Sequence, residues 1–366
     1  MPLLSLPKIC GGSAMKAMVY HGNRDLRLEE VPEPTPAAGE VKLRIDYCGI
    51  CATDIEEYEY GPLFIRHEAP HLLTGKMMPM ITGHEMTGTV VETSADVTSV
   101  HVGDRAVIDG LISCNECWWC KSGQPSQCVV MGSVGFDRAG GLAEFMTWPA
   151  SQVVKLPDNV PSRAAALCEP TAVAHHAVHR ARPEPGQSVA VIGAGTVGML
   201  ALQVAKAAGA RVYAVDQRQM SLDLATELGA DAVVNSRETD PVQALRELTG
   251  GGGPDIVIEA AGAAATPRLA VEMVRSGGKV VIVAIFTSKP EFDFNSIVTK
   301  EVHVMGSLAY ARADMESAVE LIAAGKVNTD PLVSGVIGLD QVIEVGFARM
   351  LQPTKDLFRI IVDPSL

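Results

Sequence analysis

The sequence contains no apolar run long enough to span a bilayer, few aromatic residues (5%) and no cluster of basic residues. Its 43 Asp and Glu outnumber its 30 Lys and Arg, which gives a formal net charge of −13. This balance argues against nucleic acid and anionic membranes as partners. At 366 residues, the chain is long enough for two domains with substantial hydrophobic cores.

The start of the chain lacks the cationic segment of a secretory signal, and Pro2 and Pro7 interrupt its apolar residues. We therefore expect residues 1–14 to form a loose tail ahead of a domain that begins near Met15. This expectation favours a loose tail over a cleaved export signal.

Half of the eight cysteines lie in one short segment, at Cys114, Cys117, Cys120 and Cys128. In a long, enzyme-like chain such crowding indicates metal binding rather than a disulfide framework, and it suits a reducing, cytoplasmic setting. Four thiolates that leave no open coordination position are typical of a structural zinc site. An iron–sulfur cluster also uses closely spaced cysteines and remains the alternative.

The first part of the chain, residues 15–171, predicts a β-rich domain. Residues 41–46 alternate apolar and polar side chains, as a half-buried strand does, and residues 87–92 and 105–108 are further short candidates. Glycine and proline punctuate the region throughout.

The pattern changes to alternating strands and helices over residues 172–307. Such alternation predicts parallel βαβ units, hence a doubly wound α/β sheet of the Rossmann type. The remaining residues, 308–366, are too few for a third domain and are expected to return to the first. The predicted strands are 188–192, 211–216, 232–234, 255–260, 279–285 and 302–306, and the predicted helices include 196–208, a segment ending near 228, and 311–324.

A glycine motif, Gly193-x-Gly195-x-x-Gly198, follows the first of these strands and opens a helix. In that context the first glycine permits a tight turn, the second lets the backbone approach a pyrophosphate, and the third lets helix and strand pack closely. Thr196 and Val197 begin the helix, whose free N–H groups favour a phosphate. The motif predicts a dinucleotide site, and an ordinary helix-capping turn is the alternative.

Asp216 ends the next strand, about twenty residues further on, where an acidic residue can bind the adenosine ribose hydroxyls. A carboxylate there would repel a 2′-phosphate, so the sequence favours NAD over NADP. Arg218 opposes this preference, because a nearby arginine can accommodate that phosphate.

Three further short motifs carry metal-ligand or acid–base residues, and each is ambiguous by itself. They are Gly49-Ile50-Cys51-Ala52-Thr53-Asp54, Gly83-His84-Glu85 and Cys168-Glu169-Pro170. A buried cysteine is most often a small hydrophobe. Their occurrence together with the glycine motif and the four-cysteine segment is what indicates a metal-assisted, nucleotide-dependent enzyme.

With these motifs in this order, the chain from about Met15 to its C-terminus resembles the medium-chain, zinc-dependent alcohol dehydrogenases. Within that family it is most similar to the 2,3-butanediol dehydrogenases, and next to the sorbitol dehydrogenases. The resemblance implies a GroES-like catalytic domain joined to a Rossmann domain. The segments that carry it are Glu57-Tyr58, Gly61-Pro62-Leu63-Phe64-Ile65, His71-Leu72-Leu73-Thr74-Gly75, Gly306-Ser307-Leu308-Ala309-Tyr310 and Ile337-Gly338-Leu339-Asp340.

The resemblance also assigns a second, catalytic zinc. Cys51 and His84 are similar to its ligands, and Glu169 stands where this branch has a glutamate on or near the metal. Glu85 is similar to an adjacent glutamate that binds or supports the ion. Cys168 could compete with Glu169, but the Glu-Pro pair is what matches.

A proton relay is implied next to that zinc. Thr53 matches a hydroxyl that begins the relay, and Asp54 is expected to organise the site from behind. Relatives usually carry a histidine where this chain has Glu56. A glutamate, with an ordinary pKa of about 4.3, is less suited to proton transfer at neutral pH than imidazole.

These expectations describe a zinc-dependent oxidoreductase that moves a hydride between a secondary alcohol or vicinal diol and NAD. The alternatives are a polyol or threonine dehydrogenase on the same framework, and a non-catalytic relative that keeps only the nucleotide fold. The expected partner is a small-molecule alcohol or ketone, and the resemblance implies a homodimer or homotetramer paired through the last strands of the nucleotide domain.

Overall fold

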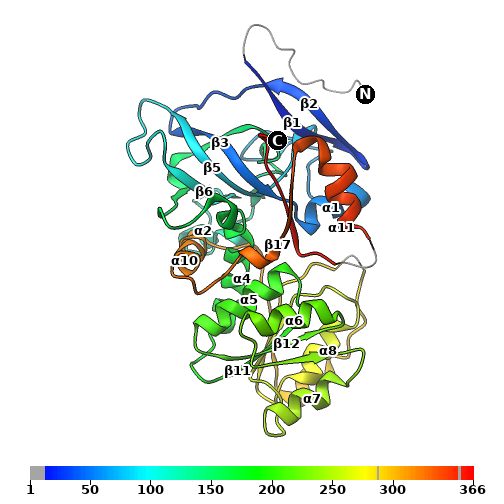
Figure 1. The fold of residues 1–366 in the computed structure, drawn as a ribbon. Coiled ribbons are helices and arrows are strands. Elements are labelled where there is room, and N and C mark those ends of the chain that lie inside the picture. Colours follow the sequence, from blue (N-terminus) through cyan, green and yellow to red (C-terminus); the bar gives the residue numbers. More distant parts are fainter. Residues whose placement is uncertain (1–12, 287, 353–355) are drawn as a thin grey trace. The chain divides into compact units, whose positions relative to one another are not determined.

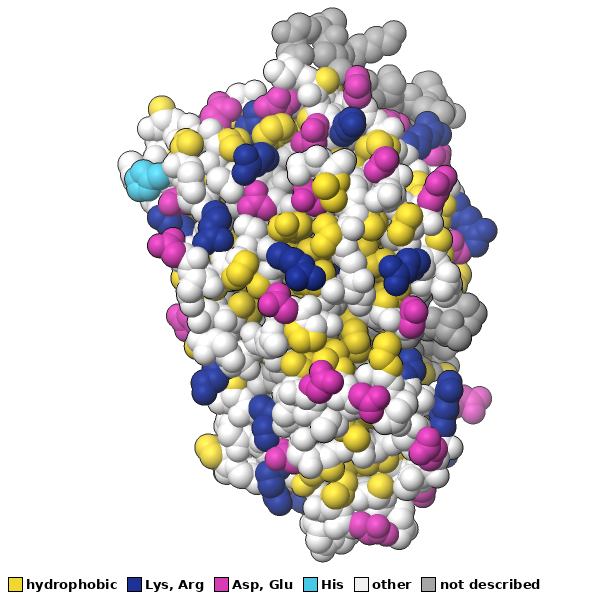
Figure 2. Space-filling view, viewed as in Figure 1, with side chains coloured by type: hydrophobic (Ala, Val, Ile, Leu, Met, Phe, Trp, Pro, Cys, Tyr) yellow, Lys and Arg dark blue, Asp and Glu magenta, His cyan; other side chains and the backbone are white. Residues whose placement is uncertain are grey.

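The computed structural model describes residues 13–286, 288–352 and 356–366. Most of the expected N-terminal tail, residues 1–12, lies outside these ranges, and Ala14 already belongs to strand β1 (Ala14–Gly22). None of the helices in the described ranges has the length and apolar character needed to cross a membrane. On the face shown in Figure 2, Lys and Arg side chains are scattered among Asp and Glu.

The chain divides into two compact units. The first unit combines Met1–Glu169 with Ala311–Val319 and Leu332–Leu366, and the second combines Pro170–Tyr310 with Glu320–Pro331. The C-terminal segment therefore belongs to the first unit, although more than a hundred residues of the second unit precede it in the sequence.

The first unit is built on β-sheet, as the sequence predicts. Its largest sheet has seven strands in the order β10-β6-β5-β3-β18-β17, with β9 also pairing with β3. The C-terminal strand β18 pairs antiparallel with β3, so that Ile361 lies opposite Gly49. The strands are β3 (Glu40–Gly49), β5 (Glu85–Thr93), β6 (Arg105–Ile108), β9 (Phe145–Pro149), β10 (Val153–Lys155), β17 (Val333–Ile337) and β18 (Arg359–Val362).

The second unit contains the predicted doubly wound sheet. Six parallel strands lie in the order β13-β12-β11-β14-β15-β16, and the strand order reverses between β11 and β14. Figure 1 labels β11 and β12 of this sheet. Every residue of β11 is buried, as expected for a strand covered on both faces. The strands are β11 (Ser188–Ile192), β12 (Arg211–Asp216), β13 (Ala232–Asn235), β14 (Ile256–Glu259), β15 (Lys279–Ile282) and β16 (His303–Gly306).

The helices follow the strands as predicted, with small differences at their ends. They include α5 (Thr196–Ala207), α6 (Gln219–Glu227), α7 (Pro241–Leu248), α8 (Thr266–Met273) and, in the first unit, most of α10 (Arg312–Ala323). Strand β15 ends at Ile282 rather than at residue 285, because Val283 and Ala284 both donate to the Glu259 carbonyl and turn away from the ladder.

Candidate active site

Cys51 is held at the start of helix α1 (Ala52–Tyr60). The Asp54 carboxylate accepts a hydrogen bond of 2.9 Å from the Cys51 N–H, which fixes the first turn of the helix. The thiol at this helix N-terminus lies at the positive end of the helix dipole. The Cys51-x-x-Asp54 spacing thus starts the helix and places the Cys51 thiol at its first turn.

His84 and Glu85 lie at the start of β5, and their placement depends on Gly83. Gly83 has a φ of +92°, and a Cβ there would come within 2.8 Å of Cys48 and 2.7 Å of Leu142. This close approach brings His84 and Glu85, which are 9% and 0% exposed, against the start of α1. One ligand atom each from Cys51, His84 and Glu85 lies within 4.8 Å of the others.

Two residues of α1 contact the edges of the His84 ring. Asp54 Oδ1 lies 3.4 Å from His84 Nδ1, and Thr53 Oγ1 lies 3.3 Å from His84 Nε2. Burial alone would lower the pKa of His84, but Asp54 and Cys51 outweigh it and raise that pKa. The cluster therefore has an excess of negative charge that attracts a cation.

Glu169 begins helix α4 (Cys168–Ala181) and interacts electrostatically with this cluster, but it is not one of the three residues within 4.8 Å. Burial raises its pKa to about 8, and His84 and Glu85 act on it in opposite directions. The neighbouring Cys168 is fully buried, and burial raises the pKa of its thiol to about 12. Burial therefore disfavours the ionised form of both side chains.

Arg359 is a charged member of the cluster that the sequence analysis missed. Its Nη1 donates a 2.6 Å hydrogen bond to the Ile50 carbonyl, and its Nη2 lies 3.0 Å from Glu85 Oε1. It is 5% exposed at the side chain and lies on β18, far from the other members in sequence. The sequence offered one signal, because Arg359 is the single charged residue in the apolar run from Phe358 to Val362. A charge in such a run indicates a buried side chain with an oppositely charged partner.

The residues fit a zinc ion. Among the described residues, the buried Glu85 Oε2 has neither a hydrogen-bond nor an ion-pair partner, and Glu85 Oε1, His84 Nδ1 and Asp54 Oδ1 make only the ion-pair contacts described above. Buried polar atoms left in this state cost free energy unless another group satisfies them. Thiolate, imidazole and carboxylate are together the donor types of catalytic zinc sites, which keep one position open.

The four-cysteine segment also forms a compact sulfur cluster in the first unit. The Sγ atoms of Cys117 and Cys120 are 3.5 Å apart, as are those of Cys128 and Cys114, and those of Cys114 and Cys120 are 3.9 Å apart. A zinc–sulfur bond of about 2.3 Å requires tetrahedral sulfurs about 3.8 Å apart. These separations fit a single ion and leave no room for the iron atoms of a cluster.

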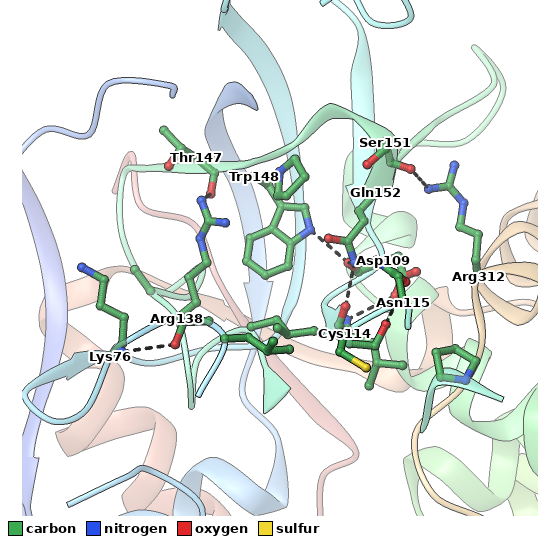
Figure 3. A pocket seen from close by; sticks show the side chains of 18 residues that line it. Lys76, Asp109, Cys114, Asn115, Arg138, Thr147, Trp148, Ser151, Gln152 and Arg312 are labelled. Carbon is green, nitrogen blue, oxygen red and sulfur yellow. Dashed lines mark hydrogen bonds between the residues drawn. The ribbon is translucent and has the colours of Figure 1, made fainter. Parts of the chain in front are cut away.

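A pocket of about 860 Å³ opens beside the sulfur cluster (Figure 3). Its lining includes Cys114, the buried Asp109, and Trp148, whose ring N–H donates to the Asp109 carbonyl at 3.0 Å. None of Cys51, His84, Glu85 or Glu169 lines it. The pocket is therefore separate from the candidate catalytic cluster.

The glycine motif in the second unit has the three environments that dinucleotide binding requires. Gly193 has a φ of +92°, and a Cβ there would lie 2.8 Å from Ala261. A Cβ on Gly195 would meet nothing within 4 Å, whereas one on Gly198 would lie 1.8 Å from the Gly193 carbonyl. Helix α5 begins at Thr196, and no side chain caps its N-terminus, so its first N–H groups are available to a phosphate.

Asp216 ends β12 beside this motif. Its Oδ2 accepts a 2.7 Å hydrogen bond from the Ala194 N–H, and its Oδ1 lies 3.2 Å from Arg218 Nε. The carboxylate therefore orders the glycine turn as well as pairing with Arg218. Asp216, which would repel the 2′-phosphate of NADP, and Arg218, which could accommodate it, therefore form one ion pair.

The chain matches two protein-family models, the alcohol dehydrogenase GroES-like domain over residues 37–158 and the zinc-binding dehydrogenase over residues 196–324. It is 36% identical to the (R,R)-butanediol dehydrogenase of Bacillus subtilis over 96% of this chain and 100% of the relative. It is 34% identical to a sorbitol dehydrogenase of Halalkalibacterium halodurans over 87% of this chain and 92% of the relative.

Solved structures give the same result. The crystal structure of 2R,3R-butanediol dehydrogenase from Bacillus subtilis has a TM-score of 0.89 at 35% identity and covers 96% of this chain and 99% of that one. A putative zinc-binding dehydrogenase from Sinorhizobium meliloti, bound to NADP, has a TM-score of 0.87 at 30% identity and covers 96% of this chain and 100% of that one.

Proposed function

The chain belongs to the zinc-dependent, medium-chain alcohol dehydrogenases, and from that premise we propose that it moves a hydride between a secondary alcohol or vicinal diol and NAD. The observation that carries the proposal is the group of Cys51, His84 and Glu85. A relative that kept only the nucleotide fold would have no need of a buried thiol–imidazole–carboxylate group with unsatisfied oxygens.

In this proposal Cys51, His84 and Glu85 hold the catalytic zinc, with Glu169 beside them. When bound, zinc acts as a Lewis acid that makes the alcohol a better hydride donor, and the nicotinamide accepts the hydride. The Thr53 hydroxyl, which contacts His84 in this group, would accept the alcohol proton while it passes its own proton on through the cofactor ribose. Glu56, three residues further along α1, would be the outer acceptor of this relay.

The test is NADH formation by purified, zinc-loaded protein with butane-2,3-diol isomers, sorbitol, threonine and bulky cyclic secondary alcohols. The similarity to butanediol dehydrogenases favours the diol, and the similarity to a sorbitol dehydrogenase supports polyols as the second candidate. Metal analysis should give two zinc ions per chain. If the protein reduced neither NAD nor NADP while both zinc sites were full, the result would support the non-catalytic alternative.

NAD is the proposed cofactor because Asp216 lies where a 2′-phosphate would be repelled. The relative from Sinorhizobium meliloti, which was solved with NADP, makes the competing possibility concrete. The kcat/KM values for NAD and NADP decide between them. Removal of the carboxylate in Asp216→Ser should shift this ratio toward NADP, because the charge that repels a 2′-phosphate is removed while Arg218 stays at this position.

We also propose that the protein is a homo-oligomer paired through strand β16. Within the second unit, β16 lies at the end of the sheet order and pairs with β15 alone. Val304 is 42% exposed on that strand, and the nearby apolar side chains of Leu308, Val298 and Ile285 are 44%, 71% and 50% exposed. An apolar edge strand of this kind favours pairing with another chain.

Light scattering after size-exclusion chromatography tests this proposal. The expected mass is two or four times the 38.7 kDa of the chain. Lysine in place of Val304 should shift the population toward monomers, and Val129→Lys, at an exposed valine of the four-cysteine segment, is the matched control. A wild-type mass of one chain would contradict the proposal.

A further inference from the structure

Glu57 is a buried carboxylate that the reaction described above does not use. It lies on α1, four residues after Thr53, and is 1% exposed. Its Oε2 accepts hydrogen bonds from the N–H groups of Phe64 at 2.7 Å and Leu63 at 3.1 Å. An ionised acceptor bound to two backbone donors holds a loop firmly, because such hydrogen bonds are about twice as strong as neutral ones.

The same residue also fixes where that loop begins. Its backbone carbonyl accepts from the Gly61 N–H at 2.9 Å and from the Tyr20 hydroxyl at 3.1 Å. A Cβ on Gly61 would lie 2.1 Å from that carbonyl and 2.5 Å from the Tyr20 hydroxyl, so only glycine fits. Residues 61–65, called here the clamp loop, are therefore anchored to α1 through both the backbone and the side chain of Glu57.

The clamp loop contacts the turn that carries Phe136. The Phe64 and Phe136 ring centroids are 5.5 Å apart with planes tilted by 58°. Directly after the loop, Arg66 Nε lies 3.3 Å from Asp137 Oδ1, which gives a second connection to the same turn. Ring pairs at such separations are attractive and have preferred geometries, so the position of Phe64 favours one position of Phe136.

Phe136 in turn lies against the ring of His84. Their centroids are 5.1 Å apart, with an interplanar angle of 38°, and Phe136 is 8% exposed. Thr53 and Asp54 contact the two nitrogen edges of the same imidazole. Helix α1 therefore contacts the edges of His84 directly, and reaches one face of its ring through Glu57 and the two phenylalanines.

From these contacts we propose that Glu57 is a positioning residue, which fixes the plane of the His84 imidazole through the clamp loop and the Phe64–Phe136 pair. The inference rests on the proposed role of His84 as a zinc ligand. A ligand whose ring is held in one orientation binds its metal more tightly. Loss of a group that hydrogen-bonds directly to a ligand costs about 10–100-fold in metal affinity, and for Glu57, which acts through other residues, we expect the lower end of that range. Leu in place of Phe136 should have the same consequence as loss of the Glu57 carboxylate.

The experiment measures zinc release to a colorimetric chelator from the full-length, zinc-loaded protein. In Glu57→Gln, we expect the catalytic zinc to leave at least tenfold faster, while the zinc of the four-cysteine cluster leaves at the wild-type rate. The matched control is Glu59→Gln on the same helix, whose carboxylate pairs with the exposed Arg24. Substitution of cobalt at the catalytic site should show a changed visible spectrum in Glu57→Gln and not in Glu59→Gln.

A double-variant cycle tests whether Glu57 acts on His84 through Phe64 and Phe136. Phe136→Leu should speed release by itself, and adding Glu57→Gln to it should change the rate little further, because the connection to His84 is already lost. Should Glu57→Gln fail to fold, Phe64→Leu and Phe136→Leu carry the same test. Equal acceleration at both metal sites, or at neither, would overturn the proposal. A wild-type protein with a single class of zinc would instead contradict the proposed catalytic site.

Discussion

Asp109 shows at the scale of one residue how a carboxyl group can oppose folding. It lines the pocket in Figure 3, and its Oδ1 accepts a hydrogen bond from Leu111 N–H at 3.2 Å. Burial raises its pKa to about 6. Because folding raises this pKa, the folded state favours the protonated carboxyl group. Its contribution to the free energy of unfolding is fully present below the unfolded pKa of about 3.9 and is lost as the pH rises through about 6.

Asn in place of Asp109 should therefore stabilise the protein increasingly as the pH rises. The amide oxygen can still accept from Leu111, and the variant avoids the ionisation that costs the wild type about 3 kcal/mol in total, about half of it between pH 5 and 8. Denaturant unfolding of both proteins at several pH values measures this difference. A gap that stays constant from pH 5 to 8 would show that Asp109 titrates normally.

Arg359 has the opposite role, because it compensates buried negative charge. Met in its place should lower the free energy of unfolding of the metal-free protein by about 3–5 kcal/mol, since Glu85 would be left without its counter-charge. Zinc should reduce the deficit, because the ion would supply positive charge to the same group. Unfolding with and without zinc measures both effects, and Arg237→Met, at an exposed position, should change neither.

Residue identity in the sequence does not reveal which charges are buried. Lys42 lies in the alternating segment at residues 41–46, yet it is 8% exposed and pairs with Glu33. Its burial depends on a partner from another segment of the chain. Arg359 was missed for the same reason, since its contacts with Ile50 and Glu85 form only when β18 pairs with β3.

At the scale of secondary-structure elements, the β11–α5 turn separates two roles of glycine. Ala in place of Gly195 should leave stability unchanged and weaken NADH binding at least tenfold, because its Cβ has space in the protein but would meet the pyrophosphate. Ala in place of Gly198 should destabilise the second unit itself, because its Cβ would lie 1.8 Å from the Gly193 carbonyl.

Fluorescence titration with NADH and thermal unfolding, measured on both variants, separate these effects. Gly252→Ala is the control, since its Cβ also meets nothing within 4 Å and it lies outside the glycine motif. Normal NADH binding by Gly195→Ala would mean that the cofactor does not approach this turn.

Elements of this kind could be predicted because their signals are local. The strand β11, the glycine turn and helix α5 lie within twenty residues, and apolar periodicity with turn chemistry is enough to predict them. The clamp loop could not be found in this way. Its function depends on Phe64 meeting Phe136, seventy-two positions later, and no periodic pattern relates two such segments.

At the scale of the whole molecule, we expect the sulfur cluster to contribute mainly to stability and the Cys51 group mainly to activity. The sulfur cluster ties together a segment whose only helices are α2 (Trp118–Lys121) and a single 3-10 turn, so its ion replaces a hydrophobic core. The Cys51 group instead lies between α1 and β5, which packing and backbone hydrogen bonds already hold in place.

Ser in place of Cys117 should therefore remove one zinc per chain and lower the thermal unfolding temperature, whereas Ser in place of Cys51 should remove the other zinc and abolish turnover with a smaller loss of stability. The difference follows because a structural ion contributes directly to folding free energy, while a catalytic ion occupies a site that the fold has already formed. Metal analysis, calorimetry and NADH formation on the two variants measure the three quantities. If Cys51→Ser lowered the unfolding temperature as much as Cys117→Ser, the catalytic site would itself depend on its metal to fold, and the separation would be wrong.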